Sequence, residues 1–223
     1  MFGKDAIIVS LKLFVITAVV AFCLAFVNKV TAPVIAGNAA KAESEALRAV
    51  LSDAKEFKSS DAPETNIEGV TIEKFNIGLN NAETVGYVVT AVSNAGYGGD
   101  IKVMVGIDKD LAVTRIQILE SSETAGLGAN ASKPGFAGQF EGTKGGLEVV
   151  KGQAKEGQVS AIASATITSK AVTSCVNAAV EAATQKSENA AAAAEETAKK
   201  FEEIKQETEV QLGETVTEGG AVE

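Results

Sequence analysis

The chain has 223 residues, a hydrophobic fraction of 46% and a formal net charge of −9. This length suffices for one medium-sized domain with appendages and is short for two full domains. The chain contains no histidine, so the side chain most often used for general acid–base catalysis is missing. The acidic balance gives no support for nucleic-acid binding, which depends on a basic surface.

A long apolar segment near the amino terminus predicts one transmembrane helix. Every residue from Leu13 to Val27 is apolar except Thr17. The wider window Ile7–Val27 covers about 21 residues, and at about 1.5 Å per residue it spans a hydrocarbon core of roughly 30 Å. Lys12 can extend its charge to the near interface. We therefore expect a membrane anchor over residues 1–30, in contact with the lipid bilayer.

Two other interpretations of this segment stay open. A cleaved signal peptide would need a shorter apolar region with small residues before the cut, and Val34-Ile35-Ala36 offers such a place. A lipoprotein anchor at Cys23 is disfavoured, because the bulky Phe22 stands where a small residue is expected. Cys23 lies inside the apolar run, so it and Cys175 suggest no disulfide framework. Basic residues are nearly balanced on the two sides of the run and do not fix its orientation.

A helix and four strands follow in chain order. Asn38 is a candidate N-cap for a helix over Ala39–Lys55, and residues 31–60 are expected to form a helical linker. Strands are predicted over Val70–Ile77, Thr84–Ser93, Ile101–Ile107 and Leu111–Leu119. The connections between them are too short for crossover helices, so neighbours should pair antiparallel. We expect an α+β domain over residues 61–184, a mainly antiparallel sheet with helices on one side.

An acidic, low-complexity tail over residues 185–223 follows this domain. From Thr184 to the end there are ten Glu and four Lys, a net charge of −6. Alanine, glutamate and lysine favour helix, but few large apolar residues are available for burial. We expect a solvated helix that frays, and we assign it no function.

Two glycine-rich loops are candidates for the walls of a cleft. Gly96–Asp100 contains Tyr97, and its glycines permit positive φ angles and close backbone approach; taken alone, this loop is an ordinary hairpin connection. The loop Glu123–Gly128 leaves the last predicted strand. A glutamate, a hydroxyl, a leucine and two glycines of this loop can form a wall against a flat ring: Glu123, Thr124, Leu127, Gly126 and Gly128. Taken alone, this loop is also compatible with an ordinary glycine-rich surface loop.

The segment from Ser164 to Ser169 places a threonine hydroxyl, that of Thr166, where a helix begins. Small residues such as Ala165 put little bulk around it, so a modifying enzyme can reach it. Thr168 or Ser169 can cap the helix. Its apolar face uses Val172, Val176, Ala179 and Ala183. Free amides and the positive end of the helix dipole would then face a phosphate. On spacing alone, a helix start without a ligand remains the alternative.

Several of these motifs, in this order, resemble the G subunit of the Rnf complex, a membrane redox pump that couples ferredoxin and NAD to ion transport. The chain is similar, less closely, to the C subunit of the sodium-pumping quinone reductase. The resemblance runs from Leu13 to about Ala183. It includes the apolar helix, both glycine loops and three further segments: Val27–Pro33, Ile101–Ile107 and Phe136–Gly142.

The resemblance implies an FMN-binding domain over residues 61–184. In that family, the threonine that ends a Ser-Gly-Ala-Thr segment carries FMN through a phosphoester bond, attached by a separate flavin transferase that uses FAD. That threonine corresponds to Thr166. Ala163 and Ser164 stand here where Ser and Gly are usual, and Ser160 stands where an aspartate usually precedes. The other implied FMN-binding residues are Tyr97, Glu123, Thr124, Leu127, Gly128, Ala165, Thr168 and Ser169, the last two at the phosphate.

The resemblance also implies an electron-carrier subunit of an ion-translocating ferredoxin:NAD oxidoreductase, without an acid–base or metal site of its own. It implies the other membrane subunits of the complex as partners. It places the protein in the cell membrane with a single pass, the amino terminus inside and the carboxy-terminal domain outside the cytoplasm. Two alternatives remain open: a stand-alone, membrane-anchored extracytoplasmic flavoprotein reductase, and a structural subunit without flavin.

Overall fold

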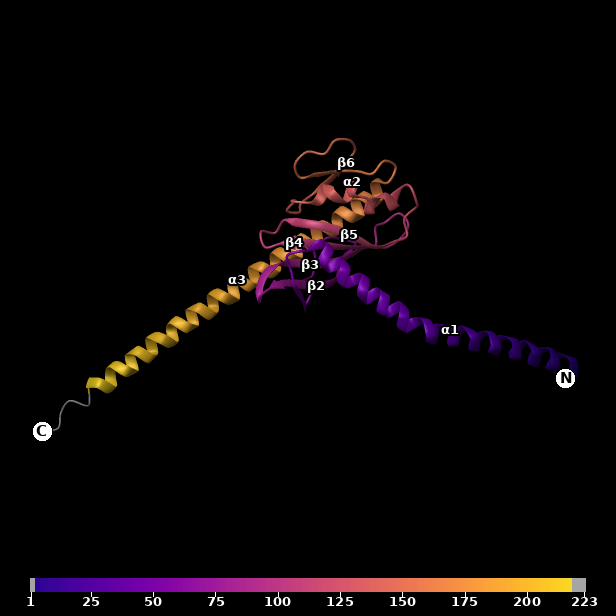
Figure 1. Cartoon of the computed structure of the whole chain (residues 1–223), viewed down its shortest axis with the longest axis horizontal. Helices are drawn as coiled ribbons and strands as arrows, with labels where there is room; N and C mark the ends of the chain where they lie inside the picture. Colours follow the sequence, from indigo (N-terminus) through magenta and orange to yellow (C-terminus); the bar gives the residue numbers. More distant parts are fainter. Residues whose placement is uncertain (1–2, 218–223) are drawn as a thin grey trace. The chain divides into compact units, whose positions relative to one another are not determined.

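The structure is a computed structural model that describes residues 3–217. The chain divides into two compact units, Met1–Ala46 and Leu47–Glu223. Helix α1 (Lys4–Val50) forms the first unit and ends in the second (Figure 1). The helix predicted over Ala39–Lys55 is confirmed as far as Val50, but it does not begin at Asn38, which lies inside α1. The Ala-rich sequence around Asn38 favours helix, so nothing there ends the one that began in the apolar run.

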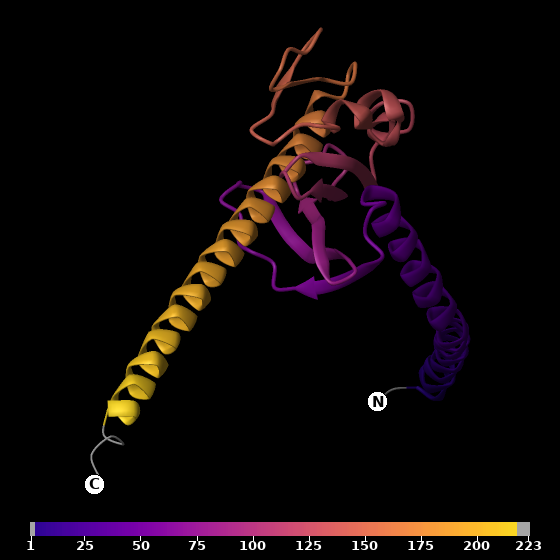
Figure 2. The ribbon, with the colours of Figure 1, turned by 60° about the vertical axis from the view of Figure 1, so that its left-hand side comes forward.

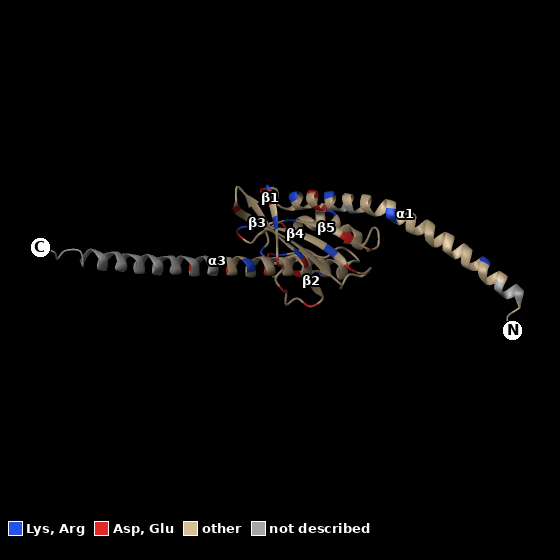
Figure 3. Ribbon diagram, turned by 90° about the horizontal axis from the view of Figure 1, so that it is seen from below, with Lys and Arg blue, Asp and Glu red and all other residues tan. Residues whose placement is uncertain are grey.

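Helix α1 is the candidate membrane span, because it is long and apolar enough to cross a bilayer. Its large apolar side chains between Ile8 and Ile35 are 50–71% exposed. The Thr17 hydroxyl donates to the carbonyls of Leu13 (3.1 Å) and Phe14 (2.9 Å), so this polar group is satisfied within the helix, as a lipid environment requires. In Figure 3 charged residues are sparse along the apolar stretch and gather toward the carboxyl end of α1.

The second unit is built on a five-stranded sheet in the order β1-β2-β3-β4-β5, with every neighbouring pair antiparallel. The strands are β1 (Glu56–Ser60), β2 (Val70–Asn80), β3 (Glu83–Ser93), β4 (Ile101–Asp108) and β5 (Val113–Ser121). The predicted α+β class is therefore confirmed. Sequence analysis missed β1, which lies in the predicted helical linker and has one large apolar residue, Phe57. It also missed a small parallel pair, β6 (Glu148–Val150) and β7 (Gln158–Ser160).

Helix α3 (Thr166–Thr217) packs its first turns across one face of the sheet, against β2, β3 and β4 (Figure 2). The predicted apolar stripe is confirmed, since Val172, Val176, Ala179 and Ala183 are fully buried. Short connecting helices, η1 (Gly128–Ser132), α2 (Pro134–Ala137) and η2 (Gly138–Phe140), add Phe136 and Phe140 to this core. The helix continues to Thr217, and residues 218–223 of the acidic tail lie outside the described residues.

The opposite face of the sheet is covered by the end of α1 and the residues after it, which corrects the expectation of helices on one side only. Val50, Leu51 and Ala54 are buried. Gly106 of β4 lies directly under Val50, and a Cβ at this glycine would lie 2.6 Å from the Val50 carbonyl carbon. The Thr114 hydroxyl donates to the Val50 carbonyl, one of the acceptors that a helix end leaves without an intrahelical partner. The sheet is thus fixed between two layers.

Candidate functional site

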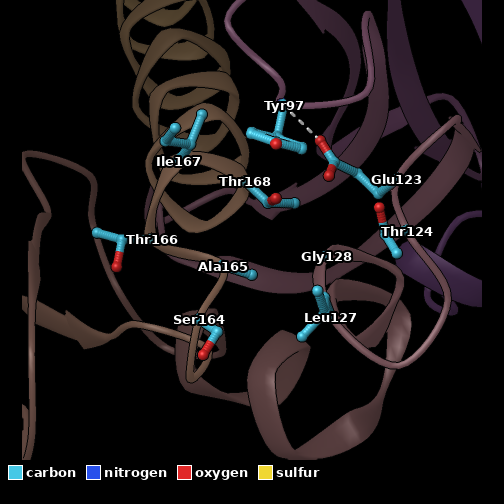
Figure 4. Close-up of a pocket in the computed structure, with 10 residues that line it drawn as sticks. All are labelled: Tyr97, Glu123, Thr124, Leu127, Gly128, Ser164, Ala165, Thr166, Ile167 and Thr168. Carbon is cyan, nitrogen blue, oxygen red and sulfur yellow. Dashed lines mark hydrogen bonds between the residues drawn. The ribbon is translucent and has the colours of Figure 1, made fainter.

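A pocket of about 410 Å³ lies at the start of α3, a volume within the range of small-molecule sites. Three segments far apart in the sequence form it (Figure 4). The ten lining residues are Tyr97, Glu123, Thr124, Leu127, Gly128, Ser164, Ala165, Thr166, Ile167 and Thr168. The structure therefore brings together eight of the nine predicted site residues, and only Ser169 lies outside the group.

A tight turn presents Thr166 to the pocket. The Ala165 N–H donates to the Ile162 carbonyl (3.0 Å), and Ser164 within this turn has φ +61°. Thr166 follows as the first residue of α3 and is half-buried. The prediction that Thr168 or Ser169 caps the helix is wrong, because both lie in its first turns. The amides of that first turn have no intrahelical acceptor and are available to an anion next to Thr166.

Ser169 lies behind the turn and braces it. Its side chain is fully buried. Its hydroxyl donates to the Ala165 carbonyl (2.9 Å) and accepts the N–H of Ile162 (3.0 Å). One bond is made to each end of the turn. The Ser169 hydroxyl therefore holds the backbone that precedes Thr166 and does not line the pocket.

Replacing Ser169 by alanine should loosen this turn. The half-buried Ile162 N–H loses its acceptor, whereas the buried Ala165 carbonyl keeps the backbone N–H of Ser169 (3.0 Å). We expect a loss of stability of about 1 kcal/mol. Thermal unfolding of the full-length protein measures this loss. Ser174→Ala, on the same helix and half-buried, is the matched control. Equal stability of the two variants would contradict the bracing role.

Gly128 creates part of the pocket by having no side chain. A Cβ at this position would lie 2.7 Å from Thr168 Oγ1 and 2.9 Å from the Glu123 Cβ. Thr168 is itself 1% exposed, so it cannot move aside easily. In the close-up, Thr168 faces Glu123 and Gly128, whereas Thr166 lies at the outer edge of the group (Figure 4). The glycine thus keeps open the space between the loop and the helix start.

The rim of the pocket is apolar and open to solvent. Tyr97, Leu127 and Ile167 are 74%, 42% and 52% exposed, and large apolar side chains that are exposed around one pocket mark a binding site. A flat aromatic ring fits against such a rim, and the helix start offers amides to a phosphate, so these residues suit FMN. Sequence reasoning did not assign Ile167 and Ser164 to the site. Ile167 could have been found as an isolated large residue that falls outside the buried stripe of α3.

Ser164 occupies a left-handed conformation that favours glycine. We expect Ser164→Gly to stabilise the protein by about 1 kcal/mol, because relief of the left-handed strain exceeds the extra entropy that glycine gives the unfolded chain. Thermal unfolding measures the change. Ser164→Ala removes the same hydroxyl and leaves the strain, so it should give no stabilisation; a gain with alanine would assign the effect to the hydroxyl instead.

Residues 96–181 match the family model described as FMN-binding domain, and this match gives the class of protein to which the sheet and its pocket belong. The chain is 40% identical over 186 residues to the G subunit of the Na(+)-translocating ferredoxin:NAD(+) oxidoreductase complex of Acetobacterium woodii, a match that covers 77% of this chain and 88% of that protein. It is 38% identical over 162 residues to the proton-translocating counterpart of Clostridium ljungdahlii, with coverage of 72% and 82%. The chain therefore belongs to the G subunits of Rnf-type ion-translocating oxidoreductase complexes, and the resemblance seen in the sequence is confirmed.

Another relative and one solved structure are also similar to this chain. The G subunit of the ion-translocating oxidoreductase complex of Methanosarcina acetivorans is 32% identical over 189 residues, which covers 80% of this chain and 95% of that protein. Among solved structures, Shewanella oneidensis NqrC is 22% identical, with a TM-score of 0.43 over 57% of this chain and 65% of that one.

Proposed function

We propose that this protein is a covalently flavinylated electron carrier, in which FMN is attached through a phosphoester bond to Thr166. It serves a membrane redox pump of the ferredoxin:NAD oxidoreductase type that moves ions. The observation that carries the proposal is the Thr166 hydroxyl at the start of α3, on the edge of a pocket lined by seven other residues that the sequence had assigned to FMN.

Thr166 is the hydroxyl best placed for the attachment. Thr168 is buried, and the hydroxyl of Ser169 is used by the backbone. The thiol of Cys175 is fully buried, and burial raises its pKa to about 12, so it stays protonated and unreactive at neutral pH. Ser164 is exposed, but its left-handed backbone places it before the helix rather than at the free amides of the first turn. Those amides favour a phosphate on Thr166.

The remaining pocket residues would hold the ring and the ribityl chain. The apolar contacts come from Tyr97, Leu127 and Ile167. Hydroxyl groups come from Thr124 and Thr168. Space for the cofactor is left by the small residues Ala165 and Gly128. Bound FMN supplies the redox chemistry, since it exchanges one or two electrons, and the protein binds and orients it. The chain itself needs no general acid or base for this task.

The membrane helix and the covalent bond fit one arrangement. Residues 1–30 anchor the protein in the lipid bilayer of the cell membrane, beside the other subunits of the complex, and residues 61–184 carry the flavin outside the cytoplasm. A covalent bond is useful there, because a dissociated flavin would be lost. Attachment requires a flavin transferase that uses FAD. Within the described part of the acidic tail, residues 185–217, no residue lines the pocket.

Coexpression with a flavin transferase tests the proposal. The purified protein should show a fluorescent band on a denaturing gel and gain the mass of one FMN less one water. A dark band, obtained while the transferase labels a second known substrate in the same cells, would favour a structural subunit without flavin. Purification together with other membrane subunits distinguishes the pump from a stand-alone reductase, which would be recovered alone.

A further inference from the structure

We propose that Glu123 is a positioning residue that holds Tyr97 at the mouth of the pocket, and that it acts through the backbone of the Gly96–Asp100 loop rather than by touching the flavin ring. This inference rests on the proposed flavin site and gives Glu123 and Tyr97 different roles in it. Sequence reasoning placed Glu123 among the direct contacts of the ring or ribityl chain, whereas the geometry assigns its carboxylate to another task.

One carboxylate oxygen of Glu123 accepts two backbone amides. The N–H of Tyr97 donates to Oε1 at 2.7 Å, and the N–H of Gly98 donates to the same atom at 3.2 Å. The first of these bonds is the dashed line in Figure 4. Hydrogen bonds to an ionised acceptor are about twice as strong as bonds between neutral groups. The carboxylate therefore ties the loop that carries Tyr97 to the loop that follows β5.

The Tyr97 loop has little else to hold it. Residues 94–100 are exposed except for Gly96, and Tyr97 itself is 74% exposed. Gly98 approaches the neighbouring loop so closely that a Cβ there would lie 2.8 Å from the Ser122 carbonyl carbon. This contact brings the two backbones together, but the hydrogen bonds to Glu123 fix their register. An exposed loop without buried side chains has low local stability, so loss of the carboxylate should release Tyr97.

The same side chain reaches the third segment of the pocket. The other carboxylate oxygen of Glu123 lies close to the place that a Cβ on Gly128 would occupy, and Thr168 Oγ1 lies 2.7 Å from that place. Glu123 thus runs along the pocket wall between Gly128 and the start of α3. Its oxygen Oε1 is taken up by the Tyr97 loop, so Glu123 contributes to the cover over the flavin through the position of the exposed Tyr97 ring.

The first measurement needs no flavin. Hydrogen exchange of the full-length protein in detergent, read by mass spectrometry on the peptide that contains Tyr97 and Gly98, should be at least about tenfold faster in Glu123→Ala, the size expected for one bond to a charged group. Glu123→Gln keeps an oxygen acceptor and should exchange within about threefold of the wild type, because a neutral acceptor is only about half as strong. Glu120→Ala, at a carboxylate paired with Lys102 on the sheet, should leave the exchange unchanged.

The second measurement uses the flavinylated protein, with the loading checked by intact mass. Iodide should quench flavin fluorescence more strongly in Glu123→Ala and in Tyr97→Ala than in the wild type. The double variant should show no more quenching than either single variant, because both substitutions remove the same cover, the Tyr97 ring over the flavin. Unchanged exchange in Glu123→Ala, exchange in Glu123→Gln as fast as in alanine, or additive quenching would overturn the proposal. A wild-type protein without added mass would instead refute the flavin attachment, while the exchange result would still decide the role of Glu123.

Discussion

Thr166→Ala is expected to remove the covalent flavin completely. The phosphoester needs a hydroxyl oxygen at this position, and no other hydroxyl among the described pocket residues combines access with a place at the free amides of α3. Beyond the mass difference between threonine and alanine, intact mass should fall by one FMN less one water relative to the wild type, and the fluorescent band on a denaturing gel should disappear. Both measurements are made after coexpression with the transferase.

Two variants serve as controls for this result. Thr166→Ser keeps the hydroxyl and should retain the flavin, although the lost methyl group leaves the side chain more rotamers. Thr168→Ala removes a hydroxyl that is buried in the pocket wall and should also retain the covalent flavin. Thr166 is half-buried, and its side chain makes no hydrogen bond to the described residues. Thr166→Ala should therefore unfold at the same temperature as wild-type protein prepared without flavin. A flavin that persists in Thr166→Ala and maps to Ser164 or Thr168 would contradict the assignment.

The residues that line the pocket could be predicted from the sequence because they occur in short segments with distinctive order. The two glycine loops and the threonine segment can be recognised directly in the sequence. Eight of the nine residues assigned from them line one pocket. The role of Ser169 could not be predicted, since it depends on a turn whose shape is set by Ser164 at φ +61°. A motif shows which residue types lie near a ligand, but it does not show which of their side chains form hydrogen bonds with the backbone instead.

The fold was predictable where the apolar pattern was long and regular. Strands β2 to β5 carry alternating or continuous apolar residues, and their antiparallel order followed from short connections. Strand β1 has too few apolar residues to be recognised, and β6 and β7 have three residues each. The second layer over the sheet was missed for another reason: nothing in the local sequence of Val50 or Gly106 shows that these residues meet.

The close approach of Gly106 to Val50 predicts the largest loss of folding stability, which we expect for Gly106→Ala. The new Cβ would overlap the carbonyl oxygen of Val50 and lie 2.5 Å from Thr114 Oγ1. The obstacle is backbone rather than the end of a flexible side chain, and Val50 and Leu51 are both buried. The end of α1 must lift from the sheet, which would expose Val88 and Met104 beneath it. We expect a loss of about 3 kcal/mol, at the upper end for overpacking.

Thermal or urea unfolding of the full-length protein, followed by circular dichroism, measures this loss. Gly138→Ala is the matched control, because Gly138 has a helical φ of −68° and open space around its Cβ position. It should be neutral or slightly stabilising, since alanine restricts the unfolded chain. If Gly106→Ala unfolds like this control, the end of α1 does not lie on that face of the sheet. If it is strongly destabilised, the end of α1 is an integral part of the FMN-binding domain.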